Sequence, residues 1–81
     1  MLDRNGFEKW VAENGTGHVV RKHFNVIDYA FATMNDGWIA IFEVDDGMYI
    51  PKMQAADEAH ADSWCYMIER PRVQFNVIWD G

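Results

Sequence analysis

Apolar and polar residues alternate along the middle of the chain, in a pattern that predicts an antiparallel meander of three strands. Two short turn sequences, Asn35-Asp36-Gly37 and Asp45-Asp46-Gly47, interrupt this alternation. A Gly after Asp or Asn readily adopts the positive φ that tight hairpin turns require. We therefore predict strands over residues 26–34, 38–44 and 48–52, joined by these two turns.

A period of three to four residues near the start of the chain predicts a short amphipathic helix over residues 6–14. Its apolar face holds Phe7, Trp10 and Val11. Asn5 and Glu8 resemble a capping box at its start, and Gly15 is a candidate C-cap. Because so short a helix is not stable alone, we expect it to dock on the sheet through its apolar face.

The segment that follows this helix mixes apolar and basic side chains. Residues 18–24 are compatible with an edge strand or with an irregular lead-in to the meander, and Asn25 indicates a turn or bulge. Farther along, Pro51 has no N–H group to donate, which favours an edge strand or the end of a strand.

From Met53 onward the period becomes helical and predicts a second helix over residues 53–69. One arc of this helix holds Ala56, Ala59, His60, Ser63, Trp64 and Met67, and the opposite arc holds Glu58, Asp62, Cys65 and Glu69. Pro71 ends the helix, because the residue before a proline avoids helical φ and ψ. A competing interpretation ends the helix near Asp62 and makes residues 63–69 a strand, since residues 64–68 are β-prone.

Alternation returns over residues 73–79 and predicts a last strand. The predicted order is therefore α-β-β-β-β-α-β, in a single α+β domain over residues 1–81. We expect an antiparallel sheet of four to five strands with the two helices packed on one face. The 49% of hydrophobic residues, with 15% aromatic residues, supply the core that so small a domain needs.

The net charge of −6 disfavours direct binding to nucleic acids and to anionic membranes. Basic proteins are the partners that this charge favours. The single cysteine, Cys65, excludes an internal disulfide and is typical of a reducing compartment, so we expect a cytoplasmic protein. No charged-then-apolar leader and no apolar run of about 20 residues is present.

Candidate chemistry is sparse. His18 and His23 have the spacing of some zinc ligands, but five positions along a strand place them on opposite faces. His60 and Cys65 diverge on a helix, and no phosphate-binding, metalloprotease or nucleophile-elbow motif occurs. The sequence therefore predicts a non-enzymatic protein without a metal ion or cofactor.

Acidic residues at turns and on the second helix form the candidate binding surface. Together with one tyrosine, the predicted partner-binding residues are Asp36, Asp45, Asp46, Tyr49, Asp57, Glu58, Asp62 and Glu69. If the turns and the helix project the same way, these carboxylates form one continuous negative surface that attracts a basic partner. Aromatic residues in excess of the core are a second candidate contact patch, through Tyr49, Tyr66 or Trp79. Plain turn chemistry and solubility are the alternative explanation for the acidic residues.

A tiny acidic single-domain chain without a catalytic constellation is similar in composition to inhibitor proteins of bacteriophages and mobile elements. The resemblance implies binding to a host defence enzyme, of the anti-CRISPR or anti-restriction type, and it transfers no site residue. The leading hypothesis is thus a protein-binding inhibitor or modulator of a basic, for example nucleic-acid-binding, host protein. The alternative is a homo-oligomeric structural or accessory module, such as a homodimer.

Overall fold

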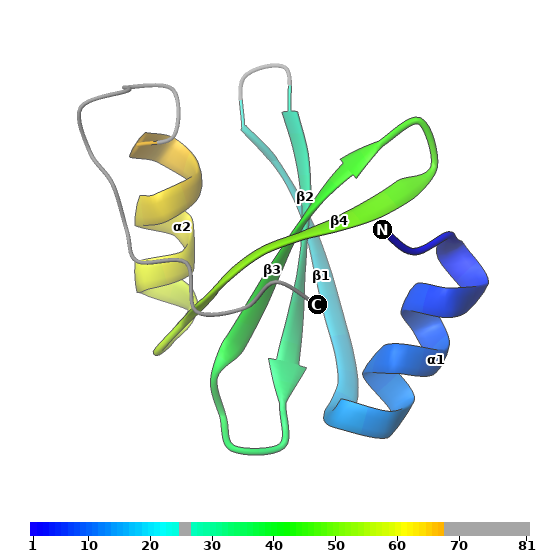
Figure 1. Ribbon diagram of the computed structural model, residues 1–81. Helices are drawn as coiled ribbons and strands as arrows, with labels where there is room; N and C mark the ends of the chain where they lie inside the picture. Colours follow the sequence, from blue (N-terminus) through cyan, green and yellow to red (C-terminus); the bar gives the residue numbers. More distant parts are fainter. Residues whose placement is uncertain (25–26, 68–81) are drawn as a thin grey trace.

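The structure is a computed structural model that describes residues 1–24 and 27–67. Its elements are α1 (Arg4–Asn14), β1 (Gly15–Phe24), β2 (Ile27–Met34), β3 (Ile39–Asp45), β4 (Met48–Ala55) and α2 (Glu58–Met67). The four strands form one antiparallel sheet in the order β1-β2-β3-β4 (Figure 1). The predicted α+β class and antiparallel meander are confirmed. The predicted strand over residues 73–79 and the turn or bulge at Asn25 lie outside the described residues.

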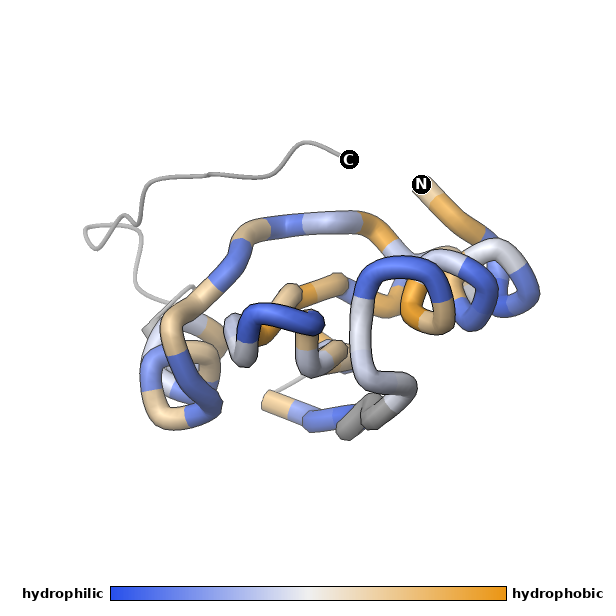
Figure 2. The backbone as a smooth tube through the Cα atoms, turned by 90° about the horizontal axis from the view of Figure 1, so that it is seen from below, coloured by the Kyte–Doolittle hydropathy of each residue, from blue (hydrophilic) through white to orange (hydrophobic). Residues whose placement is uncertain are grey.

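The two helices cover opposite faces of the sheet, which corrects the prediction that both pack on one face. Along β2, Tyr29 and Phe31 contact the α2 side, while Ala30 and Ala32 belong to the α1 side. Successive residues of a strand point to opposite faces, and residues 29–32 of β2 are all apolar and buried, so the strand needs cover on both faces. The two helices lie on either side of the strands (Figure 1, Figure 2).

The core under α1 combines apolar side chains of the helix with three alanines and one phenylalanine of the sheet. Its buried members are Phe7, Val11, Ala30, Ala32, Ala40 and Phe42. Phe7 meets Phe42 edge-on, with ring centroids 4.7 Å apart, and stacks on Tyr49 at 4.2 Å. The alanines of β2 and β3 leave room for these rings, so that the short helix docks closely.

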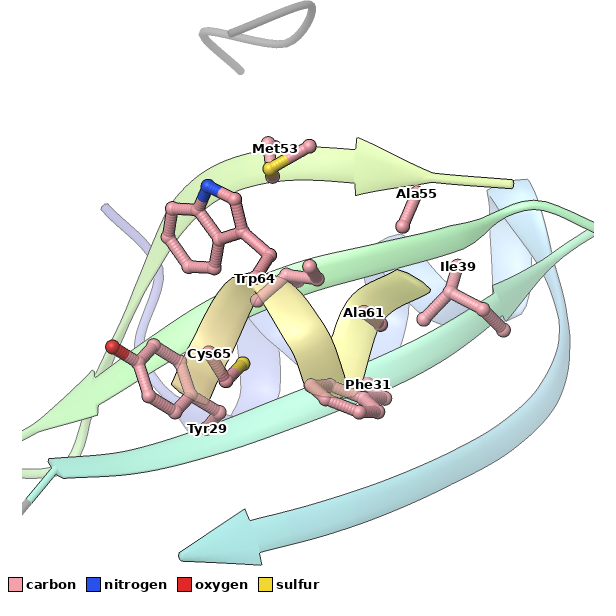
Figure 3. Packing of buried hydrophobic residues seen from close by; sticks show 9 residues of the cluster. Tyr29, Phe31, Ile39, Met53, Ala55, Ala61, Trp64 and Cys65 are labelled. Atoms are coloured by element: carbon pink, nitrogen blue, oxygen red, sulfur yellow. The ribbon is translucent and has the colours of Figure 1, made fainter. Parts of the chain in front are cut away.

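The core under α2 draws on three strands and the helix. Its buried members are Tyr29, Phe31, Ile39, Ile41, Met53, Ala55, Ala61, Trp64 and Cys65. In Figure 3, Trp64 and Cys65 point from α2 toward the strands (Figure 3). The Trp64 ring approaches Tyr29 edge-on, with centroids 6.0 Å apart. This core explains why β4 runs to Ala55 rather than ending at residue 52 as predicted.

Both predicted hairpin turns are confirmed. Gly37 has a φ of +90°, and Gly47 has a φ of +77° next to Asp46 at +52°. Positive φ at two successive residues is the geometry of a two-residue hairpin turn whose twist matches that of the strands. Asp45 and Met48 pair across this turn and set the register of β3 against β4.

The start of α1 differs from the sequence prediction. Asp3, rather than Asn5, caps the helix, since its Oδ1 accepts a hydrogen bond from the Gly6 N–H at 2.7 Å. The helix therefore begins at Arg4, before the predicted residue 6. Both Asp and Asn cap well, so local chemistry alone does not decide between them.

The second helix is shorter than predicted and is turned about its axis. Asp57 caps it by accepting from the His60 N–H at 2.8 Å, so that α2 begins at Glu58 and residues 53–55 stay in β4. Ala61, Trp64 and Cys65 face the core, whereas Cys65 was predicted on the outer arc. The competing strand interpretation is wrong for residues 63–67, which are helical.

Gly15 joins α1 directly to β1, and we predict that Gly15→Ala destabilises the protein by about 1–3 kcal/mol. Its φ of −129° suits any residue, but an added Cβ would overlap the backbone oxygen of Thr33. Urea unfolding should show this loss. Thr16→Ala, at the next and exposed position, is the control and should change stability by less than about 0.5 kcal/mol.

Candidate acidic interaction surface

The predicted acidic surface is divided between separate parts of the molecule. Asp36 lies in the turn between β2 and β3, whereas Asp45 and Asp46 lie at the turn between β3 and β4. Consecutive turns of a meander lie at opposite ends of a sheet, as Figure 1 shows. The two acidic turns therefore do not form the continuous surface that the sequence suggested.

The carboxylates of α2 are largely engaged within the fold. Glu58 forms an ion pair with Lys22 of β1, with 3.0 Å between Oε1 and Nζ. This hydrogen bond raises the pKa of Lys22, and the nearby Asp62 adds to the effect. Hydrogen bonds from the His60 backbone and ring lower the pKa of Asp57. The Glu58–Lys22 pair joins α2 to the sheet, whereas the Asp57–His60 contacts lie within the start of the helix. Glu69 lies outside the described residues.

Asp62 is the least accessible of the predicted binding residues on α2. It is half-buried, and its Oδ1 is buried without a hydrogen-bond partner among residues 1–24 and 27–67. Its charge adds to burial in raising the pKa of Cys65 to about 12. The charge of Asp62 thus acts on Lys22 and Cys65 within the fold.

We predict that the Cys65 thiol reacts with alkylating reagents only when the protein unfolds. Cys65 has no exposed surface, and its raised pKa leaves almost no thiolate at neutral pH. Labelling with a maleimide or a disulfide reagent should be slow in the native protein and fast in denaturant. Native labelling as fast as that of the denatured chain would contradict the buried position.

Of the aromatic residues predicted to be exposed, Tyr66 is 54% exposed on α2, which confirms that part of the prediction. Tyr49 is half-buried, because its ring stacks on Phe7 and its backbone pairs with Leu2. Trp79 lies outside the described residues.

Trp38 is a surface residue that the sequence prediction missed. It was placed in the strand over residues 38–44, yet β3 begins at Ile39 and the Trp38 side chain is 40% exposed. The backbone N–H of Trp38 donates to Oδ1 of Asp36 at 3.0 Å, and the backbone N–H of Asn35 donates to the Asn14 carbonyl at 3.1 Å. The turn therefore carries an exposed indole and a carboxylate beside the end of α1. The sequence did offer one signal of this exposure, because Trp38 directly follows the turn glycine Gly37.

Most basic side chains of the described residues are paired with carboxylates. The ion pairs are Arg4–Glu8, Arg21–Asp28, Lys22–Glu58 and Lys52–Glu43. In contrast, Asp36, Asp45 and Asp46 have no ion-pair partner in this part of the chain. Asp3 and Glu13, before and in α1, are likewise exposed without an ion-pair partner among the described residues. The unpaired carboxylates thus lie on the turn of Asp36, on the turn of Asp45 and Asp46, and at α1.

A histidine, an arginine and an aspartate meet where β1 and β2 pair. His23 Nδ1 lies 2.5 Å from Asp28 Oδ1, and Arg21 contacts the other carboxylate oxygen. These hydrogen bonds, from His23 first and Arg21 second, lower the pKa of Asp28. Arg21 and His23 are therefore both paired with Asp28 within the fold.

Asp28 should make the protein sensitive to acid. Because its folded pKa lies below the ordinary 3.8, it stabilises the fold above that value. The stabilisation is lost as pH falls through the lowered folded pKa. In urea unfolding at several acidic pH values, Asp28→Asn should flatten the fall in stability, whereas the control Asp45→Asn should leave the slope unchanged. Equal slopes for wild type and Asp28→Asn would contradict this role.

The described residues offer few sites for other chemistry. No group of three or more His, Cys, Asp or Glu side chains in these residues is placed to hold a metal ion. An open depression beside α1 is lined by Glu8, Val11, Ala12 and Gly17, and its one carboxylate is already paired with Arg4. The residues that stand out for recognition are the turn carboxylates and Trp38.

No helix in the described part of the chain has the length and apolar character needed to cross a membrane. Comparison of the chain with protein-family models, with curated proteins and with solved structures finds no match.

Proposed function

We propose that the protein is a non-catalytic binding module that recognises a basic protein through the carboxylates of its hairpin turns. The observation that carries this proposal is the uneven pairing of charge. Four of the basic side chains form ion pairs within the protein, while Asp36, Asp45 and Asp46 are exposed and have no such partner in the part of the chain that the structure describes.

Exposed carboxylates of this kind attract a basic partner over a distance and orient it on approach. They also occupy sites on the partner that otherwise hold phosphate groups. A nucleic-acid-binding host protein is therefore the partner class, and inhibition or modulation of that protein is the expected effect. Action of the anti-CRISPR or anti-restriction type is one form of this proposal. The reduced and buried Cys65 fits a cytoplasmic location.

Trp38 supplies the apolar part of the proposed contact. Tryptophan is enriched among the residues that dominate binding energy, and its ring attracts Arg and Lys side chains. Beside Asp36, it can stack on a basic side chain whose charge the carboxylate neutralises. The turn of β2 and β3 is thus the proposed anchor, and the Asp45–Asp46 turn at the other end steers the partner.

The test compares two triple variants with the same change in net charge. Asp36→Asn/Asp45→Asn/Asp46→Asn removes the free carboxylates, and Glu8→Gln/Glu43→Gln/Glu58→Gln removes paired ones. Binding to a labelled arginine-rich peptide is measured over a salt series. The first variant should weaken binding about tenfold, because three exposed pairs contribute roughly 0.2–1 kcal/mol each.

Equal losses in both triple variants would overturn the proposal, since net charge alone would then explain binding. Trp38→Ala, at unchanged net charge, should weaken binding as well. Circular dichroism of each variant establishes that it is folded before binding is compared.

A homo-oligomeric accessory module is the second candidate function. It is favoured by β1, which forms an edge of the described sheet, and by the exposed Tyr66 on α2. Light scattering over a range of concentrations separates the two candidates. A monomer at high protein concentration would contradict the oligomeric function and leave the binding proposal standing.

A further inference from the structure

Four steps in the described residues place an Asn or Asp directly before a glycine. They are Asn5-Gly6, Asn14-Gly15, Asp36-Gly37 and Asp46-Gly47. At such a step the glycine nitrogen can attack the side-chain carbonyl carbon of the preceding residue, because no Cβ hinders the approach. Whether it does so depends on what holds the glycine N–H and the side chain.

The two steps in and after α1 are held by hydrogen bonds. The Gly6 N–H donates to Asp3 Oδ1 at 2.7 Å, and the Gly15 N–H donates to the Val11 carbonyl. The Asn14 amide also donates to the Trp10 carbonyl at 2.9 Å, away from Gly15. Attack at either step requires the end of the helix to open first.

The Asp36–Gly37 step is held twice. The Gly37 N–H donates to the Met34 carbonyl at 2.9 Å. The Asp36 carboxylate is directed toward residue 38, because its Oδ1 accepts from the Trp38 N–H. Both reacting groups are therefore engaged elsewhere.

The Asp46–Gly47 step has none of these restraints. Among residues 1–24 and 27–67, no hydrogen bond is made by the Gly47 N–H or by the Asp46 carboxylate. Both residues are exposed, and no atom crowds the Cβ position of Gly47 within 4 Å. Asp46 also has a φ of +52°, which is uncommon for a residue other than glycine.

We propose that Asp46–Gly47 is a site of spontaneous covalent modification, at which Asp46 converts to isoaspartate through a succinimide. The Gly47 nitrogen bonds to Cγ of the protonated Asp46 carboxyl, and the C–OH bond breaks. The hydroxyl group leaves as water with the proton that the nitrogen loses. Solvent water then adds to either carbonyl of the ring. Opening at the former backbone carbonyl gives isoaspartate, and opening at the other restores Asp46. One water is released and one consumed, with no oxidation or reduction.

The modification would act on the register of the sheet. Isoaspartate adds one methylene to the main chain inside the two-residue turn that pairs Asp45 with Met48. A longer link no longer fits the tight turn that positions β4 against β3. The carboxylate is kept, so the charge at the turn is unchanged while its geometry is altered.

The test is incubation of the folded protein for weeks at body temperature and neutral pH, followed by peptide mapping and enzymatic isoaspartate labelling. Isoaspartate at Asp46 should exceed that at Asp36 at least tenfold, since the loss of even one of the two hydrogen bonds at the Asp36–Gly37 step, at about 1.4 kcal/mol, corresponds to a factor of ten. Asp46→Gly, which suits the positive φ, should remove the signal from this turn and keep the fold.

The second part of the test repeats the incubation with denatured protein. There the two Asn-Gly steps should react first, because an amide forms the succinimide faster than a carboxylate at neutral pH. In the folded protein the order should be reversed in favour of Asp46. Modification of Asn5, Asn14 or Asp36 ahead of Asp46 in the folded protein would overturn the proposal.

Discussion

Replacing Phe42 by Ala is expected to lower the free energy of unfolding by about 3–5 kcal/mol, the largest effect of any single substitution on the α1 side. Phe42 has no exposed surface. Its ring meets Phe7 at 4.7 Å and Trp10 at 5.3 Å, both edge-on. Its neighbours on the sheet, Ala30 and Ala40, are small, so they cannot fill the space that the ring leaves.

Urea unfolding followed by circular dichroism measures this loss. A small domain has only about 5–15 kcal/mol of stability, so Phe42→Ala approaches complete unfolding. Phe42→Leu keeps part of the contact and should remain folded. Trp38→Ala is the control, because this exposed ring lies outside both cores. A loss at Trp38 equal to that at Phe42 would contradict the described packing.

Replacing Trp64 by Ala is expected to cost about 3–5 kcal/mol and to release α2 from the sheet. Trp64 is 8% exposed and is the largest side chain that α2 contributes to its core. Its neighbours on the helix face, Ala61 and Cys65, are small. The helix has only ten residues, so without this anchor it is not stable alone.

The measurement is urea unfolding with the rate of Cys65 labelling as a second readout. Release of α2 exposes the buried thiol, so labelling of Trp64→Ala should be much faster than that of wild type. Ser63→Ala, on the exposed side of the same helix, should change neither quantity. Slow labelling in Trp64→Ala would show that other contacts hold the helix.

The two substitutions together test the arrangement of the helices. Phe42 and Trp64 belong to different cores on opposite faces of the sheet. The milder pair Phe42→Leu and Trp64→Phe should therefore be additive within about 0.5 kcal/mol. If both helices packed on one face and shared one core, as predicted from the sequence, the two substitutions would instead show a clear coupling energy.

The positions of the proposed recognition residues and their neighbours have both local and tertiary causes. Asp36, Asp45 and Asp46 were predictable, because turn chemistry places them at exposed tips. The pairing of Glu58 with Lys22 was not, since it joins residues far apart in the chain. Trp38 was missed as a surface residue because a tryptophan beside a strand is ordinarily buried. It is exposed because it lies just before β3, at the end of the sheet.

The sequence by itself determined the local features of the protein. The glycines of the two turns, the alternation in β2 and β3 and the helical period near residues 6–14 depend on neighbours along the chain, so the meander and the first helix were predictable. Only the tertiary structure decided that the helices lie on opposite faces, that α2 turns Cys65 inward and that most basic residues are neutralised. A strand apolar on both sides carries no local signal for which helix covers which face, and that choice is made by long-range packing.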